Sequence, residues 1–572
     1  MTAQVLRKST HFSIMFKGLL SHLCLLLLIC CVSSTKESHS LLVKRVNEYL
    51  SDVQRSQHLL QAFVESGSMD GMFTTEEVNI IFETLQEKYP QFVSKEIIGK
   101  TVKGKDIPAY TLSSTNLEKK YKKSKVLFTG AHHARELLTP TIILRIYIEA
   151  LHSLIHPSKS MEYWRYNDLL IIPIVNLDSH AKISASWNTG RWDTDKWIRK
   201  NQQQGCKTES HTGVDLNRNY GFHYGETTED LDPCSETFRG QTAFSEPETQ
   251  AVRSFVEKHT GMISSAMNFH SYGNMWLRPF NYMRVKDTWP DRFDQTIINF
   301  YKNFDQKIKP VTTGLVGNAI ESVGYFTDGE ASDWMLGDHQ IFSFSPELGS
   351  KNPAANTFFI PKNLIFSVIL ENYSVIDLFL KENTFRPSEH VYGFNSQNLF
   401  HFSFTNEGIA TLYQPTFTFI TGSTDFTSGL KSISGKSREG NIFDIPFKVD
   451  FDKIIFSVPE INRLTEFSLD LEFLDKSVMN SKFSLDLQIS LSWGEKVASF
   501  KIYYDGRQIN EWVVYTAIII AILFMIITSI FIIEQIARNR NSNKKKKNLS
   551  SSKNPNHISV IFTADSDGDK EK

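Results

Sequence analysis

The chain has few cysteines, with only five among its 572 residues. Such a low and odd number argues against a scaffold held together by several disulfides. A basic excess is also lacking, because 62 lysines and arginines stand against 63 acidic residues, and this balance argues against a nucleic-acid binder. Global disorder is excluded, because 42 phenylalanines, 19 tyrosines and 9 tryptophans supply ample material for an apolar core.

Two long apolar runs stand near the ends of the chain. Residues 18–32 form a short apolar run that follows basic residues and precedes small ones, which predicts a cleaved signal peptide over residues 1–34. An uncleaved N-terminal anchor is the alternative. Residues 512–533 are 22 uncharged residues followed by a basic cluster. As a helix they would span about 33 Å, which predicts one transmembrane helix.

Together the two runs predict a single-pass type I membrane protein. Residues 35–511 would be extracellular or lumenal, and residues 534–572 would form a disordered, basic cytosolic tail. Three cysteines lie within the predicted signal peptide. Cys206 and Cys234 remain on the oxidising side of the membrane, where a single disulfide is the simplest interpretation.

Residues 73–383 have the pattern of an α/β domain, and residues 35–72 form a short segment before it. A capping-box signature at Thr74 and Glu77 marks its first helix. Amphipathic segments alternate with short apolar runs that are typical of buried strands, at residues 126–129, 169–175, 262–269 and 341–344.

Beyond residue 383 the spacing of apolar residues changes from the 3.6-residue repeat of a helix to the two-residue repeat of a strand. Residues 467–473, for example, read FSLDLEF. Several such segments in succession predict a β-sandwich module over residues 384–511. We expect this module to act as a stalk or interaction module, and its partner is unknown.

Candidate metal ligands occur where two of the predicted strands end. His133 and Glu136 have H-x-x-E spacing in a strand-to-helix turn, and His270 ends another apolar strand. Sites of α/β proteins lie outside the carboxyl ends of strands. Two histidines and one glutamate leave a fourth position of Zn²⁺ open to water, as in a catalytic site. Glu347 follows a further apolar strand and is a candidate general base, with a solvated strand-end carboxylate as the alternative.

With these motifs, residues 73–383 resemble the zinc metallocarboxypeptidases of the carboxypeptidase A/B type. The metal motif H-A-R-E of that family stands at residues 133–136, and its G-V-D-x-N-R-N motif stands at residues 213–219. The resemblance implies a mixed central sheet flanked by helices and one Zn²⁺ per catalytic domain. It also implies hydrolysis of the C-terminal peptide bond of peptides or proteins, with His133, Glu136 and His270 as ligands and Glu347 as base.

The resemblance implies roles for further residues. Arg199 matches the arginine that stabilises the developing oxyanion. Asn217 and Arg218 match the groups that bind the terminal carboxylate of the substrate. Cys234 stands at a disulfide position of the family, while Cys206 departs by a few inserted residues. The substrate-binding positions as a whole fall on Arg135, Asn217, Arg218, Tyr325 and Ser332.

Two alternatives stay open. Ser332 occupies the pocket-floor position at which basic-specific relatives carry a carboxylate. Glu330 lies two residues earlier and would supply that charge, giving a basic or mixed preference, unless it is a solvated loop glutamate. For the whole protein, the competing hypothesis is a catalytically silent receptor or adhesion protein that binds C-termini, against which the complete ligand set with Glu347 argues.

Overall fold

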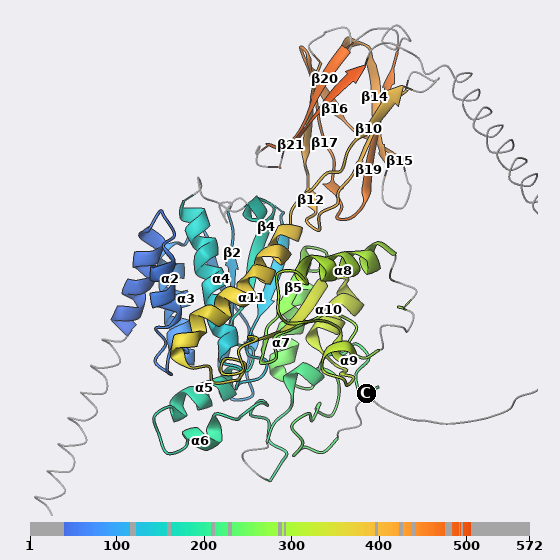
Figure 1. Ribbon diagram of the computed structural model, residues 1–572. Helices are drawn as coiled ribbons and strands as arrows, with labels where there is room; N and C mark the ends of the chain where they lie inside the picture. Colours follow the sequence, from blue (N-terminus) through green and yellow to red (C-terminus); the bar gives the residue numbers. More distant parts are fainter. Residues whose placement is uncertain are drawn as a thin grey trace, which may run out of the picture. The chain divides into compact units, whose positions relative to one another are not determined.

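The computed structural model describes residues 39–504 apart from short gaps. The gaps are residues 115–121, 157–161, 208–211, 227–230, 284–288, 291–292, 294, 395–398, 422–426, 437–441, 475–482, 491 and 493–495. The predicted signal peptide, transmembrane helix and cytosolic tail lie outside the described residues. Within them, an α/β region and a β-rich region follow one another, and each has its own apolar core (Figure 1).

The α/β region is built on a mixed sheet, which in the described residues has nine strands. Their order is β1-β2-β4-β3-β5-β9-β7-β8, with β6 paired to β9. The strands are β1 (Val93–Lys100), β2 (Asp106–Leu112), β3 (Ser124–Thr129), β4 (Asn167–Ile172), β5 (Ile263–Asn268), β6 (His270–Ser271), β7 (Met275–Leu277), β8 (Leu315–Gly317) and β9 (Phe342–Leu348). Strands β4, β3, β5 and β9 run parallel and are mostly buried. They coincide with the predicted apolar runs, because a central strand covered on both faces needs apolar residues throughout.

Helices lie on both sides of this sheet (Figure 1). They are α2 (Gln57–Val64), α3 (Thr75–Lys88), α4 (Leu138–Ile155), α5 (Leu177–Ser186), α6 (Trp192–Asp195), α7 (Pro247–Lys258), α8 (Gln295–Ile308), α9 (Ala319–Ser322), α10 (Ala331–His339) and α11 (Lys362–Glu382), with 3-10 turns η3 (Glu162–Arg165) and η5 (Leu216–Arg218). The predicted capping box is confirmed, because the hydroxyl of Thr74 accepts the N–H of Glu77 at 3.1 Å and the Glu77 carboxylate accepts the N–H of Thr74 at 2.9 Å.

Two helices among the described residues are long and apolar enough to cross a membrane by length and composition alone, namely α4 and α11. In α4, 83% of the apolar window is buried inside the protein. Its hydrophobicity is therefore explained by the core of the α/β region.

The β-rich region consists, in its described part, of two five-stranded sheets and one two-stranded sheet. The sheet orders are β10-β11-β19-β14-β15, β16-β17-β13-β20-β21 and β12-β18. The strands are β10 (Val391–Phe394), β11 (Leu399–Thr405), β12 (Leu412–Tyr413), β13 (Thr416–Ile420), β14 (Leu430–Lys436), β15 (Ile442–Asp444), β16 (Phe447–Asp450), β17 (Lys453–Ser457), β18 (Glu460–Ile461), β19 (Glu466–Phe473), β20 (Phe483–Ser490) and β21 (Lys496–Tyr504).

The predicted period of two is confirmed in this region. In β19 every second residue from Phe467 to Phe473 is buried. Side chains from both five-stranded sheets share one core, for example Phe402 of β11 and Phe417 of β13. Such a shared core is typical of a β-sandwich, while the exact domain boundaries stay predictions.

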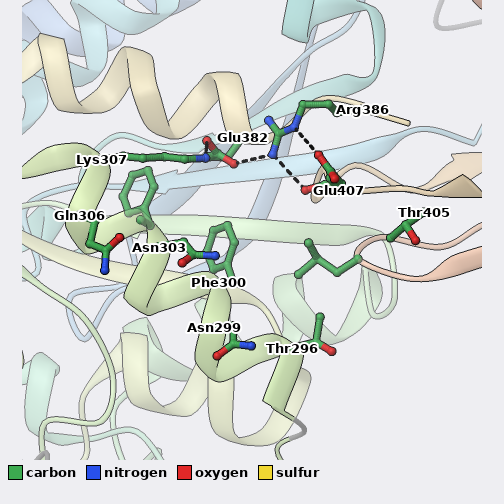
Figure 2. A pocket seen from close by; sticks show the side chains of 12 residues that line it. Thr296, Asn299, Phe300, Asn303, Gln306, Lys307, Glu382, Arg386, Thr405 and Glu407 are labelled. Atoms are coloured by element: carbon green, nitrogen blue, oxygen red, sulfur yellow. Dashed lines mark hydrogen bonds and ion pairs between the residues drawn. The ribbon is translucent and has the colours of Figure 1, made fainter. Parts of the chain in front are cut away.

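A network of ion pairs surrounds the end of α11 (Figure 2). The carboxylate of Glu382 pairs with Lys307 of α8 and, at 3.1 Å, with Arg386. Arg386 also donates to the carbonyl oxygen of Glu407 at 3.0 Å. These side chains line a cavity of about 640 Å³ and tie the end of α11 to α8 and to the chain that follows.

The buried His180 predicts a pH dependence of stability. Its Nδ1 lies 2.7 Å from the hydroxyl of Thr75, and burial lowers the pKa of His180 from 6.5 to about 4. Between these pH values the unfolded chain binds a proton that the folded chain does not. We therefore expect the free energy of unfolding to fall by about 3 kcal/mol from this group as the pH falls from about 6.5 to about 4.

The measurement is urea denaturation at pH 7 and at pH 4.5, for the wild type and for His180→Gln. Because glutamine does not titrate, the variant lacks this contribution and its stability depends less on pH. The same loss of stability in both proteins would contradict the assignment to His180.

Candidate active site and metal centre

The candidate site lies where the parallel strands end. The loop after β3 carries His133 and Glu136, β5 leads directly to His270 in β6, and β9 carries Glu347. Strands β6 and β9 pair in parallel with His270 opposite Glu347. At Gly130, which begins the loop after β3, a Cβ atom would lie 2.8 Å from the carbonyl oxygen of Pro173, so this close approach requires glycine.

The three predicted metal ligands come together in the structure. Nδ1 of His133 lies 2.6 Å from Oε1 of Glu136, and Nδ1 of His270 lies 3.0 Å from Oε2 of Glu136. The two Nδ1 atoms face each other at 3.2 Å. All three side chains are buried, and their ligand atoms lie within 4.8 Å of one another.

This donor set fits zinc. Two ring nitrogens that face each other need either a shared proton or a cation between them. Ligand atoms about 2.0 Å from a tetrahedral zinc ion are about 3.3 Å apart, which matches the separation of the two nitrogens. Two imidazoles and one carboxylate are also the ligand types of catalytic zinc sites.

Asp215 connects the metal ligands to the nearest cation. Its Oδ1 lies 2.9 Å from Nε2 of His133, and its Oδ2 accepts hydrogen bonds from Nε and Nη2 of Arg199 at 3.0 and 2.7 Å. Burial by itself would raise the pKa of Asp215, but Arg199 and His133 hold it well below its ordinary value. No local feature of the sequence indicates this role of Asp215, although it is the aspartate of the G-V-D motif.

Arg199 lies against the metal ligands and stays charged. Its Nη1 is 3.3 Å from Nδ1 of His133, and its carbonyl oxygen accepts the N–H of Ala134 at 3.1 Å. Burial by itself would lower the pKa of Arg199, but the carboxylates of Asp215 and Glu136 raise it above its ordinary value. A fixed guanidinium therefore borders the candidate metal centre.

Glu347 is partly exposed at the end of β9. Burial, followed by the nearby carboxylate of Glu136, raises its pKa well above the ordinary value. These surroundings differ from those of a solvated strand-end carboxylate, which is the alternative interpretation of the sequence. A carboxylate in this environment is a stronger proton acceptor than one in water.

A cavity of about 740 Å³ opens beside the metal centre. It is lined by Arg135, Asp193, Thr194, Trp197, Arg199, Arg218, Glu236, Thr237 and Tyr325. Arg135 forms an ion pair with Glu236 at 3.1 Å and lies over the ring of Phe358. Tyr325, between α9 and α10, is 56% exposed, so its side chain is available to a ligand. The structure thus brings four of the predicted site residues to one cavity.

Asn217 and Arg218 lie in η5, and both are buried. Oδ1 of Asn217 accepts the N–H of Ala331 at 3.0 Å, which leaves the amide NH₂ as the group that a ligand can meet. Nη1 of Arg218 donates to the carbonyl oxygen of Asn217 at 2.8 Å. Asp215 accepts the N–H of Asn217 at 3.0 Å, so the same aspartate that contacts His133 also holds this turn.

The sequence model of the family described as "Zinc carboxypeptidase" matches residues 78–374, which is more than half of the chain. The chain belongs to the zinc carboxypeptidase family. Human mast cell carboxypeptidase A is 28% identical to it over 286 residues, covering 50% of this chain and 64% of that protein. Carboxypeptidase B of Astacus astacus is 25% identical over 323 residues, covering 54% of this chain and 96% of that protein.

The chain also resembles solved structures of carboxypeptidases. The crystal structure of carboxypeptidase A from Helicoverpa armigera has a TM-score of 0.46 and 25% identity, covering 57% of this chain and 80% of that one. The structure of thrombin-activatable fibrinolysis inhibitor has the same TM-score and 22% identity. The match to human mast cell carboxypeptidase A spans 64% of that relative's length.

In this member of the zinc carboxypeptidase family, the two residues predicted to set the side-chain preference are buried. Ser332 is fully buried, and its hydroxyl accepts a hydrogen bond from Ser345 at 2.9 Å. Glu330 is only 4% exposed, so the alternative of a solvated loop glutamate is wrong. Neither residue lines the cavity of about 740 Å³ directly, but Arg218, which does, lies 3.8 Å from Glu330.

The predicted disulfide is present between Cys206 and Cys234. It joins the chain after Arg199 to the segment that carries Glu236 and Thr237. Nζ of Lys200 donates to the carbonyl oxygens of Pro233 and Ser235 in the same segment. These links hold one wall of the cavity in place.

The contact between Asp215 and His133 predicts an effect on zinc affinity. Asp215→Asn keeps the shape of the side chain but removes an acceptor, so His133 is less firmly oriented. We expect the affinity for Zn²⁺ to fall about 10- to 100-fold. Competition with a chelating dye would measure this.

The matched control is Asp305→Asn, which neutralises a buried carboxylate that pairs with Arg278 at 2.8 Å outside the metal centre. We expect its zinc affinity to equal that of the wild type. An unchanged affinity in folded Asp215→Asn protein would show that Asp215 does not support the metal site.

Proposed function

We propose that the chain is an active zinc carboxypeptidase that hydrolyses the C-terminal peptide bond of peptides or proteins. The observation that carries this proposal is the convergence of His133, Glu136 and His270, with Glu347 opposite His270 on the neighbouring strand. Membership of the zinc carboxypeptidase family supports the same reaction.

His133, Glu136 and His270 would hold one Zn²⁺ ion. When bound there, zinc would supply a Lewis acid that polarises the scissile carbonyl and lowers the pKa of water. Asp215 accepts a hydrogen bond from Nε2 of His133, which leaves Nδ1 unprotonated and turned toward Glu136 and His270. Asp215 therefore selects the tautomer of His133 that a metal requires.

Glu347 would act as the general base. Its raised pKa suits a group that accepts a proton from the attacking water and then delivers it to the leaving amine. Arg199 lies beside His133, and its guanidinium would stabilise the oxyanion that develops on the carbonyl. Asp215 keeps that guanidinium charged and in place before substrate arrives.

Recognition of a free C-terminus would fall to Arg218 and Asn217. A guanidinium and an amide NH₂ from adjacent residues can donate to both oxygens of a carboxylate. Both groups are preorganised, by the carbonyl oxygen of Asn217 and by the N–H of Ala331. Tyr325 and Arg135 border the same cavity and would contact the substrate from its walls.

We also propose that the enzyme is anchored by one membrane span over residues 512–533, with the catalytic region extracellular or lumenal. The disulfide between Cys206 and Cys234 supports this placement, because such bonds persist in oxidising compartments. The β-rich region would then lie between the catalytic region and the span.

Replacing Glu347 by glutamine tests the proposed reaction. We expect the release of C-terminal amino acids by the full-length, zinc-loaded protein to fall about 100- to 10,000-fold, because the proton acceptor is lost. Zinc content should be unchanged, since Glu347 is not among the three candidate ligands. Amino-acid release and metal analysis on the same preparations would measure both quantities.

Removing zinc from the wild type with a chelator should abolish release, and adding zinc should restore it. A folded, zinc-loaded wild type that releases no C-terminal amino acid would refute the proposal. That result would favour the competing hypothesis of a catalytically silent protein that binds C-termini.

A further inference from the structure

An exposed aromatic side chain stands in a turn of the β-rich region. Strands β16 and β17 pair in antiparallel fashion with Asp450 opposite Lys453, so Phe451 and Asp452 form the two-residue turn between them. Phe451 is 83% exposed and is the most exposed large hydrophobic residue in the part of the chain that the structure describes. Leaving an aromatic ring in water is unfavourable, so this ring is a candidate for contact with another apolar surface.

The backbone of this turn is one that aromatic residues avoid. Phe451 has a φ of 52°, in the left-handed region where a bulky side chain is strained. Hairpin turns with positive φ at the first central residue normally place glycine there. The hydroxyl of Thr427 donates to the carbonyl oxygen of Phe451, and the N–H of Thr421 donates to that of Asp452, both at 2.8 Å. The chain therefore keeps a phenylalanine where the turn itself favours glycine, which indicates a role for the ring beyond folding.

The level of the turn in its sheet follows from the strand pairing. Lys453 of β17 pairs with Ile420 of β13, and Ile420 pairs in turn with Asp486 of β20. The hydroxyl of Ser499 in β21 donates to the carboxylate of Asp486 at 2.6 Å. These four residues stand at about the same level across the sheet, and the turn at Phe451 extends beyond them.

Strand β21 ends at this same end of the sheet. It neighbours β20, and residues 491–495 join the two strands, so they run antiparallel. β20 ends at Ser490, opposite Thr416 at the far end of β13. β21 therefore returns toward the turn, passes its level at Ser499 and ends at Tyr504. The aromatic turn and the end of the last described strand thus lie at one end of the region.

Two further large side chains are exposed at this end. Leu474 is 68% exposed, and its N–H donates to the carbonyl oxygen of Gly429, two residues from Thr427, which holds the turn. Tyr503, the last residue but one of β21, is 66% exposed. We call the end that carries Phe451, Leu474 and Tyr503 the Phe451 end.

The charges around the turn balance. Asp450 and Lys453 stand opposite each other and are both exposed. Lys448 and Asp452 add one charge of each sign. The turn therefore presents no strong field to an anionic or a cationic partner. Zwitterionic lipid headgroups match this balance, and the apolar layer beneath them receives aromatic rings.

The proposed anchoring brings the Phe451 end close to a bilayer. Residues 505–511 separate the end of β21 from the apolar run over residues 512–533. Even when fully extended, a segment of this length spans at most about 25 Å. The chain between the last strand and the proposed span is therefore too short to hold this end far from the membrane.

We propose that the Phe451 end rests on the bilayer that anchors the protein, with the ring of Phe451 inserted among zwitterionic headgroups. This inference rests on the proposed anchoring by residues 512–533. Phe451 and Tyr503 stand at opposite sides of their sheet, in the order β16-β17-β13-β20-β21. A flat, fluid surface receives such separated side chains together, whereas a protein partner would need a separate pocket for each.

The test uses the full-length protein in phosphatidylcholine nanodiscs. Lys453→Cys places a thiol beside the turn, and a fluorescent label on it reports depth through quenching by doxyl groups on the lipids. Cys206 and Cys234 form a disulfide, and labelling of the wild type measures the background. We expect the emission to fall about two-fold or more, because interfacial groups lie about 5–10 Å into the headgroup boundary.

A label at Ile442→Cys is the matched control for position. Ile442 is 74% exposed, but it pairs with Lys436, which pairs with Ser468, whereas the Phe451 end begins beyond Phe473 of the same strand. We expect doxyl lipids to leave the emission of this label unchanged. An unquenched label at Lys453→Cys, or equal quenching at both positions, overturns the proposal, and the former points to a protein partner instead.

Phe451→Gly separates membrane contact from folding. Glycine adopts a positive φ without strain, so we expect stability toward urea to stay the same or rise. Quenching of the label at Lys453→Cys should be lost, because the inserted ring is gone. Ile442→Ser removes an equally exposed side chain from the other end and should keep the quenching. Quenching that persists in folded Phe451→Gly protein overturns the assignment to this ring.

Extraction with alkaline carbonate separates this inference from the anchoring. If carbonate releases the full-length protein from membranes, the proposed span fails. Flotation with phosphatidylcholine vesicles then still tests the Phe451 end. More flotation of the wild type than of Phe451→Gly supports the contact, and equal flotation overturns it.

Discussion

The buried carboxylate of Asp215 is the interaction on which the candidate site depends. Arg199 and His133 lie 3.3 Å apart at their nearest nitrogens, and a divalent cation held by His133 would repel the guanidinium further. Asp215 accepts hydrogen bonds from both side chains and supplies the negative charge that keeps them together. Asp215 also accepts the N–H of Asn217, so one anion links the candidate metal ligand, the candidate oxyanion donor and the candidate carboxylate-binding residues.

The sheet determines where this electrostatic arrangement stands. Parallel strands end at the same edge, so the loop after β3, the residues after β5 and the end of β9 bring their side chains to one place. These strands are mostly buried and belong to the core of the α/β region. The wall of the cavity beside the metal centre is formed largely by loops. There the disulfide between Cys206 and Cys234 provides a covalent link.

Much of the fold and of the candidate site was predictable from the sequence. Burial on both faces produces apolar runs, so the runs near Phe128 and Phe344 marked central strands, and burial on one face produces the alternation seen from Phe467 onward. The candidate metal ligands were predictable because H-x-x-E spacing and a histidine at a strand end are local features. The part of Asp215 was missed because its contacts with His133 and Arg199 depend on the path of irregular loops, which no local period describes.

The burial of Glu330 is a second feature that the local sequence does not predict. The sequence places an acidic residue two positions before Ser332, and it is equally compatible with a solvated loop. Only the tertiary structure decides that Glu330 is buried beside Arg218, because its surroundings come from residues 218, 281 and 327. The sequence by itself indicated the fold class and the candidate metal ligands, since periodicity and motif spacing are local, and its resemblance to known motifs indicated the family. The charge environment of the site was decided by tertiary structure, because electrostatic interactions act between atoms close in space and distant along the chain.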